Sequence, residues 1–176
     1  TTLPGGEEQV TGFYLPGEIV GLDAINNRQH ASSAVALETT AVCTIPFGDL
    51  EQLSMEIPGL QHHLFKLMSQ EIQSDQQLMV LLSKRTAEER IASLLLSLSA
   101  RHKRRRLSDA NFRLPMSRSD IGNYLGLAVE TVSRIFTRFQ QMGVLGVVGK
   151  EITILNRPQL CLLAEPTSEL NQASGT

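Results

Sequence analysis

The sequence contains no tryptophan, only two cysteines and few aromatic residues, which make up 5% of the total. Two cysteines are too few for a disulfide framework, so a reducing cytoplasm is the expected compartment. No apolar run approaches the ~20 residues that a membrane-spanning helix needs, and no signal peptide opens the chain. These absences argue against a disulfide-rich secreted domain and against a membrane partner.

Motifs for catalysis and metal binding are also missing. The chain has four histidines but neither an H-E-x-x-H nor a C-x-x-C motif, and no glycine-rich phosphate loop or nucleophile–base pair is visible. The adjacent His62 and His63 would point about 100° apart on a helix, so they share no metal face and are expected on the surface. We therefore expect that the protein is not an enzyme.

The length limits the number of domains, and the first residues indicate whether the chain is a fragment. A chain of 176 residues with 41% hydrophobic residues is long enough for one folded domain with a real core, or for two small ones. It opens with TTLPGG and without an initiator methionine, which indicates a fragment of a longer protein.

Positive charge is concentrated in one part of the chain. Residues 84–150 carry 13 Lys and Arg against five Asp and Glu, whereas the remaining residues carry three against 13. The net charge of −2 therefore hides a basic segment of +8 beside an acidic remainder of −10. This division predicts two modules, the basic one facing a polyanion.

The N-terminal half has two patterns. Residues 1–47 are rich in Val, Ile and Thr, with turn signals between the runs, and are predicted to form strands. A short helix is predicted over 49–55, and Pro58 should open a long one with an apolar row of roughly three heptads. Asp75 is an unexpected acid in that row. The predicted dimer interface consists of Leu64, Met68, Ile72, Asp75, Met79 and Leu82.

The basic segment begins with a helix and a basic loop. Thr86 and Glu89 form a capping-box pattern, and the stripe that follows is apolar at Ile91, Leu94, Leu95 and Leu98. The basic run that includes residues 102–106 is predicted to be a loop. It could contact DNA phosphates or simply be solvated.

Residues 117–155 contain the most informative pattern. Ser117 with Asp120 predicts a capped helix that Gly126 ends, and a second helix is predicted over 129–141. Residues 144–148 and 151–155 then flank Gly149-Lys150 as a hairpin. Helix, tight turn, helix and hairpin form the layout of a helix-turn-helix with a wing.

The second of these helices has two different faces. Val132, Ile135, Phe136 and Phe139 recur at helical spacing and predict a buried side. On the other side, an Arg can bind guanine through two hydrogen bonds and a Glu can accept one from cytosine N4. With Ser117 and Arg118 of the preceding helix, the predicted DNA contacts are Glu130, Ser133, Arg134, Thr137 and Arg138.

The stretch IGNYLGLAVETVSRIFTRFQ resembles the DNA-binding signature of the CRP/FNR superfamily. Two upstream segments, LMSQEIQSDQQLMVLLSKRTAEERIA and ALETTAVCTIPF, resemble its oxygen-responsive FNR/Anr branch. The resemblance covers roughly residues 5–164 and implies an α+β fold: part of a β-roll sensor domain, a long dimerisation helix and a winged helix-turn-helix. Glu130, Ser133 and Arg134 occupy the family's base-reading positions.

The resemblance also implies partners and a regulated function. Members act as dimers on two-fold double-stranded DNA with TTGAT-like half-sites, and they activate or repress transcription at low oxygen. For the basic loop, the resemblance adds contact with RNA polymerase to the two alternatives above, contact with DNA phosphates and a solvated loop. It further implies that an acid matching Asp75 keeps dimerisation weak.

The family's FNR branch holds a 4Fe–4S cluster on four cysteines, and Cys43 matches the central one. The other three have no counterpart here, so a cluster is expected in a full-length parent and not in this fragment. Without the resemblance, Cys43 would be expected to be a buried structural cysteine. Cys161 matches no ligand and is expected to pack in a C-terminal helix.

Rival functions remain open. Cyclic-nucleotide sensors of the superfamily carry an Arg in the segment matching HASSAVALETT, where this chain has none, although Glu18 is kept. A cofactor-free regulator of the superfamily is a second rival, and a helical dimerisation protein without DNA binding is a third. The expected domains are residues 1–54, 55–84 and 85–164, followed by a disordered tail over 165–176.

Overall fold

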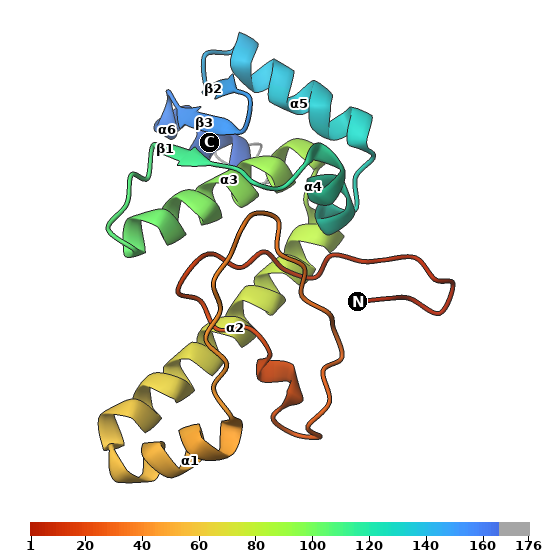
Figure 1. Cartoon of the computed structure of the whole chain (residues 1–176). Coiled ribbons are helices and arrows are strands. Elements are labelled where there is room, and N and C mark those ends of the chain that lie inside the picture. The colour runs from red at the N-terminus through yellow and green to blue at the C-terminus, as the bar shows by residue number, and fades with distance from the viewer. Residues whose placement is uncertain (166–176) are drawn as a thin grey trace, which may run out of the picture. The chain divides into compact units, whose positions relative to one another are not determined.

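The computed structural model describes residues 1–165 and divides the chain into two compact units, Thr1–Val80 and a second that begins at Leu81. Within these residues, six α-helices, one short 3-10 helix and a three-stranded antiparallel sheet confirm the α+β class (Figure 1). None of the helices in residues 1–165 combines the length and the apolarity that crossing a membrane requires. The tail predicted over 165–176 lies, apart from Glu165, outside the described residues.

The strands predicted over residues 1–47 are not formed in the structure. This region has only the 3-10 helix η1 (Leu22–Ala24) and an isolated bridge between Thr2 and Glu8. A strand is stabilised by hydrogen bonds to a neighbouring strand, and apart from that bridge no such pairing joins residues 1–47. Most of residues 26–49 is exposed, Cys43 included, so the expectation of a buried Cys43 is wrong as well.

Two helices follow, and the second of them ends within the C-terminal unit, which begins at Leu81. Helix α1 (Phe47–Glu56) contains the predicted helix, and α2 (Pro58–Lys84) starts at the predicted proline and runs for 27 residues. Pro58 is tolerated there because the first turn of a helix leaves its N–H groups without intrahelical partners.

The predicted dimer residues differ in exposure along α2. Leu64 is only 8% exposed, so it packs within the chain rather than on an open face. Met68 and Leu82 are partly buried, and Asp75 is exposed. Ile72 and Met79 are 56% and 70% exposed, and Phe65, seven residues before Ile72, is 60% exposed. We call Phe65, Ile72 and Met79 the apolar row of α2.

A tyrosine fastens the N-terminal segment to α2. The hydroxyl of Tyr14 donates a hydrogen bond of 2.9 Å to Glu71 Oε1. Burial, the hydrogen bond to Glu71 and the nearby carboxylates of Glu71, Asp75 and Asp23 raise the pKa of Tyr14 to about 12. The phenol therefore stays protonated and continues to donate at neutral pH.

Helix α3 (Ala87–Arg104) organises the C-terminal unit. Its predicted capping box is confirmed, because Thr86 and Glu89 exchange backbone-to-side-chain hydrogen bonds of 3.0 and 3.3 Å. The predicted apolar stripe of α3 is buried, and the helix packs against α5 (Val129–Gln141) and α6 (Arg157–Ala164). Residues 102–104 form its last turn, so the predicted basic loop begins later than expected.

The sheet closes the C-terminal unit. Strands β2 (Leu145–Val148) and β3 (Glu151–Ile154) form the predicted hairpin, and β1 (Asn111–Arg113) pairs with the other edge of β3, in the order β1-β3-β2 (Figure 1). The three residues of β1 were not predicted because so short a strand carries no periodic pattern.

Partly buried polar contacts hold α6 and the segment before β1 to α3. The Ser99 hydroxyl donates to the carbonyl of Asp109 at 2.6 Å, and Arg157 donates both to Ser99 Oγ and, at 3.1 Å, to the Asp109 carboxylate. Helix α6 buries only Leu160, and Cys161 beside it is exposed. The expectation that Cys161 packs as an apolar residue is therefore wrong.

Candidate nucleic-acid interface

The first helix of the predicted helix-turn-helix is α4 (Arg118–Leu125). Ser117 caps it as predicted: its hydroxyl accepts a hydrogen bond from the Asp120 amide at 3.1 Å, and the Asp120 carboxylate accepts one from the Ser117 amide at 2.7 Å. The capping box satisfies two helix N–H groups that would otherwise lack partners. The Ser117 side chain therefore serves first to start the helix.

The turn between α4 and α5 depends on two glycines. Gly126 has a φ of +64°, a left-handed conformation that suits glycine. The amide of Leu127 donates to the carbonyl of Gly122 at 2.8 Å, which draws the turn onto α4. A Cβ on Gly122 would lie 2.6 Å from the oxygen of Leu127, so only glycine fits this close approach.

Helix α5 has the predicted bounds and the predicted two faces. Its apolar residues are buried at exposures between 0 and 6%: Val132, Ile135, Phe136 and Phe139. All five side chains predicted to contact DNA from this helix are exposed: Glu130, Ser133, Arg134, Thr137 and Arg138. The sequence alone placed each of these residues on the correct side because the apolar period fixes the rotation of the helix.

The exposed polar side chains of α5 differ in whether they already form hydrogen bonds or ion pairs within the protein. The hydroxyls of Ser133 and Thr137 donate to backbone carbonyls one turn earlier, at 2.9 and 3.0 Å, which leaves their oxygens able to accept. Among residues 1–165, no hydrogen bond or ion pair engages the side chain of Glu130 or Arg134. These two side chains are available to a ligand.

Arg138 is the exception. Its guanidinium forms an ion pair with the Glu88 carboxylate in the first turn of α3. The contact ties α5 to α3 and gives Arg138 a role within the protein. Glu88 was not predicted as its partner, because fifty positions separate the two residues.

Arg118 also packs against the protein. Its guanidinium lies 3.4 Å above the centre of the Phe136 ring, a cation–π contact between α4 and α5. Burial lowers the pKa of Arg118, although the group remains charged at neutral pH because an arginine starts from so high a value. Its position fits packing of the two helices as well as the predicted contact with DNA.

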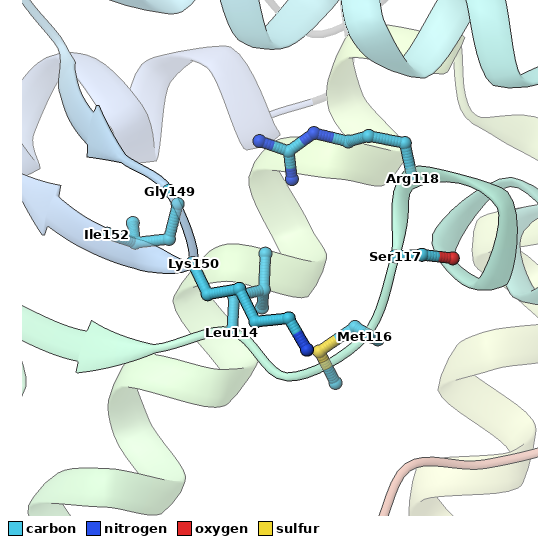
Figure 2. Close-up of a pocket in the computed structure, with 7 residues that line it drawn as sticks. All are labelled: Leu114, Met116, Ser117, Arg118, Gly149, Lys150 and Ile152. Carbon is cyan, nitrogen blue, oxygen red and sulfur yellow. The ribbon is translucent and has the colours of Figure 1, made fainter. Parts of the chain in front are cut away.

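A cavity of about 170 Å³ lies between the start of α4 and the wing (Figure 2). Arg118 and Lys150 line it from these two sides, and Lys150 Nζ donates to the carbonyl of Pro115 at 2.9 Å. The wing turn is thus bonded to the segment that leads into α4. Lys150 entered the sequence prediction only as part of the hairpin turn, although a positive charge beside a helix-turn-helix is typical of a phosphate contact.

Two family models match this chain. The Crp-like helix-turn-helix domain matches residues 89–163, and the cyclic nucleotide-binding domain matches residues 1–56. The chain is 59% identical over 160 residues to the transcriptional activator protein FnrA of Stutzerimonas stutzeri, covering 91% of this chain and 66% of that protein. It is 52% identical over 169 residues to the fumarate and nitrate reduction regulatory protein of Vibrio cholerae, covering 96% and 68%.

The chain belongs to the CRP/FNR family. Its similarity to the FnrA, Anr and FNR regulators places it in the predicted branch. Among solved structures, FixK2 from Bradyrhizobium japonicum matches with a TM-score of 0.60 and 35% identity, over 68% of this chain and 59% of that one. The chain spans 65–66% of the length of the first curated relatives that it matches.

The residues present do not fit an iron–sulfur cluster. A 4Fe–4S cluster is normally held by four thiolates, and this sequence has two cysteines. Cys43 is exposed, and no group of three or more His, Cys, Asp or Glu in residues 1–165 is arranged to hold a metal ion.

Gly122→Ala should destabilise the C-terminal unit. The added methyl must push Leu127 away from α4, and we expect a loss of about 1–3 kcal/mol in the free energy of unfolding by urea denaturation. Gly146→Ala in β2 is the matched control, since its Cβ would meet nothing closer than 3.5 Å. Equal stability of the two variants would contradict the close approach.

Arg118→Ala should also lower stability, because it removes the packing on Phe136. The free energy of unfolding, measured by thermal unfolding, should fall by about 1–2 kcal/mol. Arg134→Ala removes the same kind of side chain from an exposed site and should change stability by less than about 0.5 kcal/mol. If both variants lose the same stability, Arg118 does not support α4 against α5.

Proposed function

We propose that this chain is a sequence-specific, DNA-binding transcription regulator that acts as a dimer on TTGAT-like half-sites. The observation that carries the proposal is the division of α5, whose apolar side is buried while Glu130 and Arg134 stand exposed without partners in residues 1–165. A second helix of this kind inserts into the major groove in helix-turn-helix proteins.

The exposed side chains of α5 have distinct tasks in this proposal. Arg134 donates two hydrogen bonds to guanine, and Glu130 accepts one from cytosine N4. Ser133 and Thr137 use oxygens that their bonds to the helix backbone leave free to accept. Arg138 contributes less to base reading than the sequence suggested, because Glu88 already holds it.

Phosphate contacts come from the wing and the start of α4. Lys150 and Arg118 present two positive charges around the cavity of Figure 2, where a phosphate of the duplex can approach both. Ser117 lies at the same edge. The basic residues at and after the end of α3, in the stretch 101–106, face either phosphate or RNA polymerase.

The apolar row of α2 is the proposed dimer surface. Phe65, Ile72 and Met79 recur every seven residues and are 56–70% exposed, which is the spacing of a coiled-coil seam. Asp75 lies between Ile72 and Met79 and is exposed. In a symmetric dimer two copies of this carboxylate approach each other and weaken association.

The oxygen response of the FNR branch is a property that this chain does not carry alone. A cluster needs thiolates beyond the two in this sequence. In a longer parent that supplies them, Cys43 is the proposed fourth ligand.

Arg134→Ala should remove sequence discrimination. Loss of the bidentate contact should lower the preference for guanine over other bases at its half-site position by about 1–3 kcal/mol, with non-specific binding largely kept. Fluorescence anisotropy with matched and single-substitution duplexes measures this difference.

Arg138→Ala is the control for this prediction, one helical turn away on the same helix. Because Glu88 holds Arg138, its removal should leave the base preference nearly unchanged. An Arg134→Ala variant that discriminates like the unsubstituted chain would refute the proposed reading helix.

Asp75→Ala should strengthen dimerisation, because it removes the repulsion between two carboxylates beside the apolar row. Sedimentation equilibrium at equal concentrations should show a dissociation constant lower by about tenfold, the equivalent of about 1.4 kcal/mol. Gln73→Ala, an exposed change outside the row, should have no effect. A dimer that is unchanged or weaker in Asp75→Ala would count against the proposed interface.

A further inference from the structure

One side chain joins three segments of the C-terminal unit. Arg90, in the first turn of α3, donates hydrogen bonds to three backbone carbonyls. Its Nη2 reaches Leu82 at 2.8 Å, its Nη1 reaches Leu125 at 2.8 Å, and its Nε reaches Arg85 at 3.0 Å. Every nitrogen of the guanidinium therefore has a partner.

Two of the three carbonyls lie at the C-terminal ends of helices, and the third directly follows one of those ends. Leu82 lies in the last turn of α2, Leu125 is the last residue of α4, and Arg85 lies in the link between α2 and α3. Carbonyls at the C-terminal end of a helix lack intrahelical partners and carry the negative end of the helix dipole. A cation placed where two such ends meet satisfies both and is attracted by both.

The geometry requires an arginine. A guanidinium is a planar fork with five donors in fixed directions, whereas a lysine ammonium is a compact point charge on a flexible stem. Bonds to three carbonyls in three segments match the fork. A lysine at position 90 would keep the charge but could not reach all three oxygens at these distances.

The position of Leu125 makes this contact relevant to DNA reading. Its carbonyl directly precedes Gly126, whose left-handed conformation starts the turn into α5. A Cβ on Gly126 would lie 3.6 Å from Arg90 Nη1, so the guanidinium sits against the turn itself. Arg90 thus binds the last turn of α2 on one side and the helix-turn-helix on the other.

We infer that Arg90 is a positioning residue that fixes the orientation of the helix-turn-helix to the last turn of the dimerisation helix, and thereby sets the half-site spacing that a dimer accepts. The inference rests on the proposed function. Each base pair added between half-sites rotates one against the other by roughly 34°, so a rigid attachment selects one spacing and a loose one accepts several.

The chain supplies a matched control. Arg85 lies in the same junction, and its Nη1 is buried without a hydrogen-bond partner among the described residues. Arg85→Met removes a positive charge but no side-chain hydrogen bond that the structure describes, and it leaves the Arg85 carbonyl in place for Arg90. Arg90→Met removes the same charge together with three hydrogen bonds.

The experiment measures binding of the full chain to duplexes in which two TTGAT-like half-sites are separated by three, four or five base pairs, and to a single half-site. The unsubstituted chain and Arg85→Met should prefer one of the three spacers over the other two. In Arg90→Met this preference should fall by about tenfold, while affinity for the single half-site stays within about twofold. Circular dichroism verifies that each variant is folded.

The outcomes separate the two claims. If the unsubstituted chain shows no preference for any spacer, the proposed dimeric reading fails and the inference fails with it. If Arg90→Met keeps the full spacer preference, or if Arg85→Met loses it equally, the inference is wrong and the proposed function stands.

Arg90→Lys keeps the test decisive if Arg90→Met does not fold. The lysine retains the charge at the two helix ends but lacks the fork, so spacer preference should fall while unfolding midpoints stay close to those of the unsubstituted chain. A folded Arg90→Lys variant with the full preference would overturn the inference.

Discussion

Burial of one side of α5 is the constraint on which the rest of the interface depends. Val132, Ile135, Phe136 and Phe139 are almost fully removed from water, and each such side chain stabilises the fold by about 1.5–3 kcal/mol. A rotation of the helix that exposed them would cost several kcal/mol. The polar residues between them are therefore held outward, and their chemistry determines what the chain binds.

Other contacts set where that helix begins and how it is oriented. The close approach at Gly122 fixes the turn, Arg118 packs on Phe136, and the ion pair of Arg138 with Glu88 ties α5 to α3. Arg90 then connects the turn to the last residues of α2. At Gly122 a Cβ would not fit, and without Arg90 three backbone carbonyls would lose the hydrogen bonds that it donates.

Features that depend on residues close together in the sequence could be predicted, whereas features that depend on distant residues could not. The bounds of α5 and the cap of α4 were predicted correctly because caps, glycines and apolar periods act within a few residues. The strands expected over residues 1–47 were not formed, since a strand depends on a distant partner that local pattern does not reveal. Glu88 as the partner of Arg138 and the Leu125 carbonyl as a partner of Arg90 were missed for the same reason, as no spacing rule encodes contacts across 35–50 positions. Cys161 was misplaced because helix α6 is short and buries a single residue.

The central claim is that a chain with a net charge of −2 binds DNA through a basic unit and reads its sequence through α5. Affinity for a TTGAT-N4-ATCAA duplex and for a scrambled duplex, measured from low to physiological salt, tests both parts at once. We predict that log K falls with log salt by about 0.9 for each phosphate neutralised on both duplexes, and that the matched duplex binds more tightly throughout. Salt-independent affinity, or equal affinity for the two duplexes, would contradict the claim.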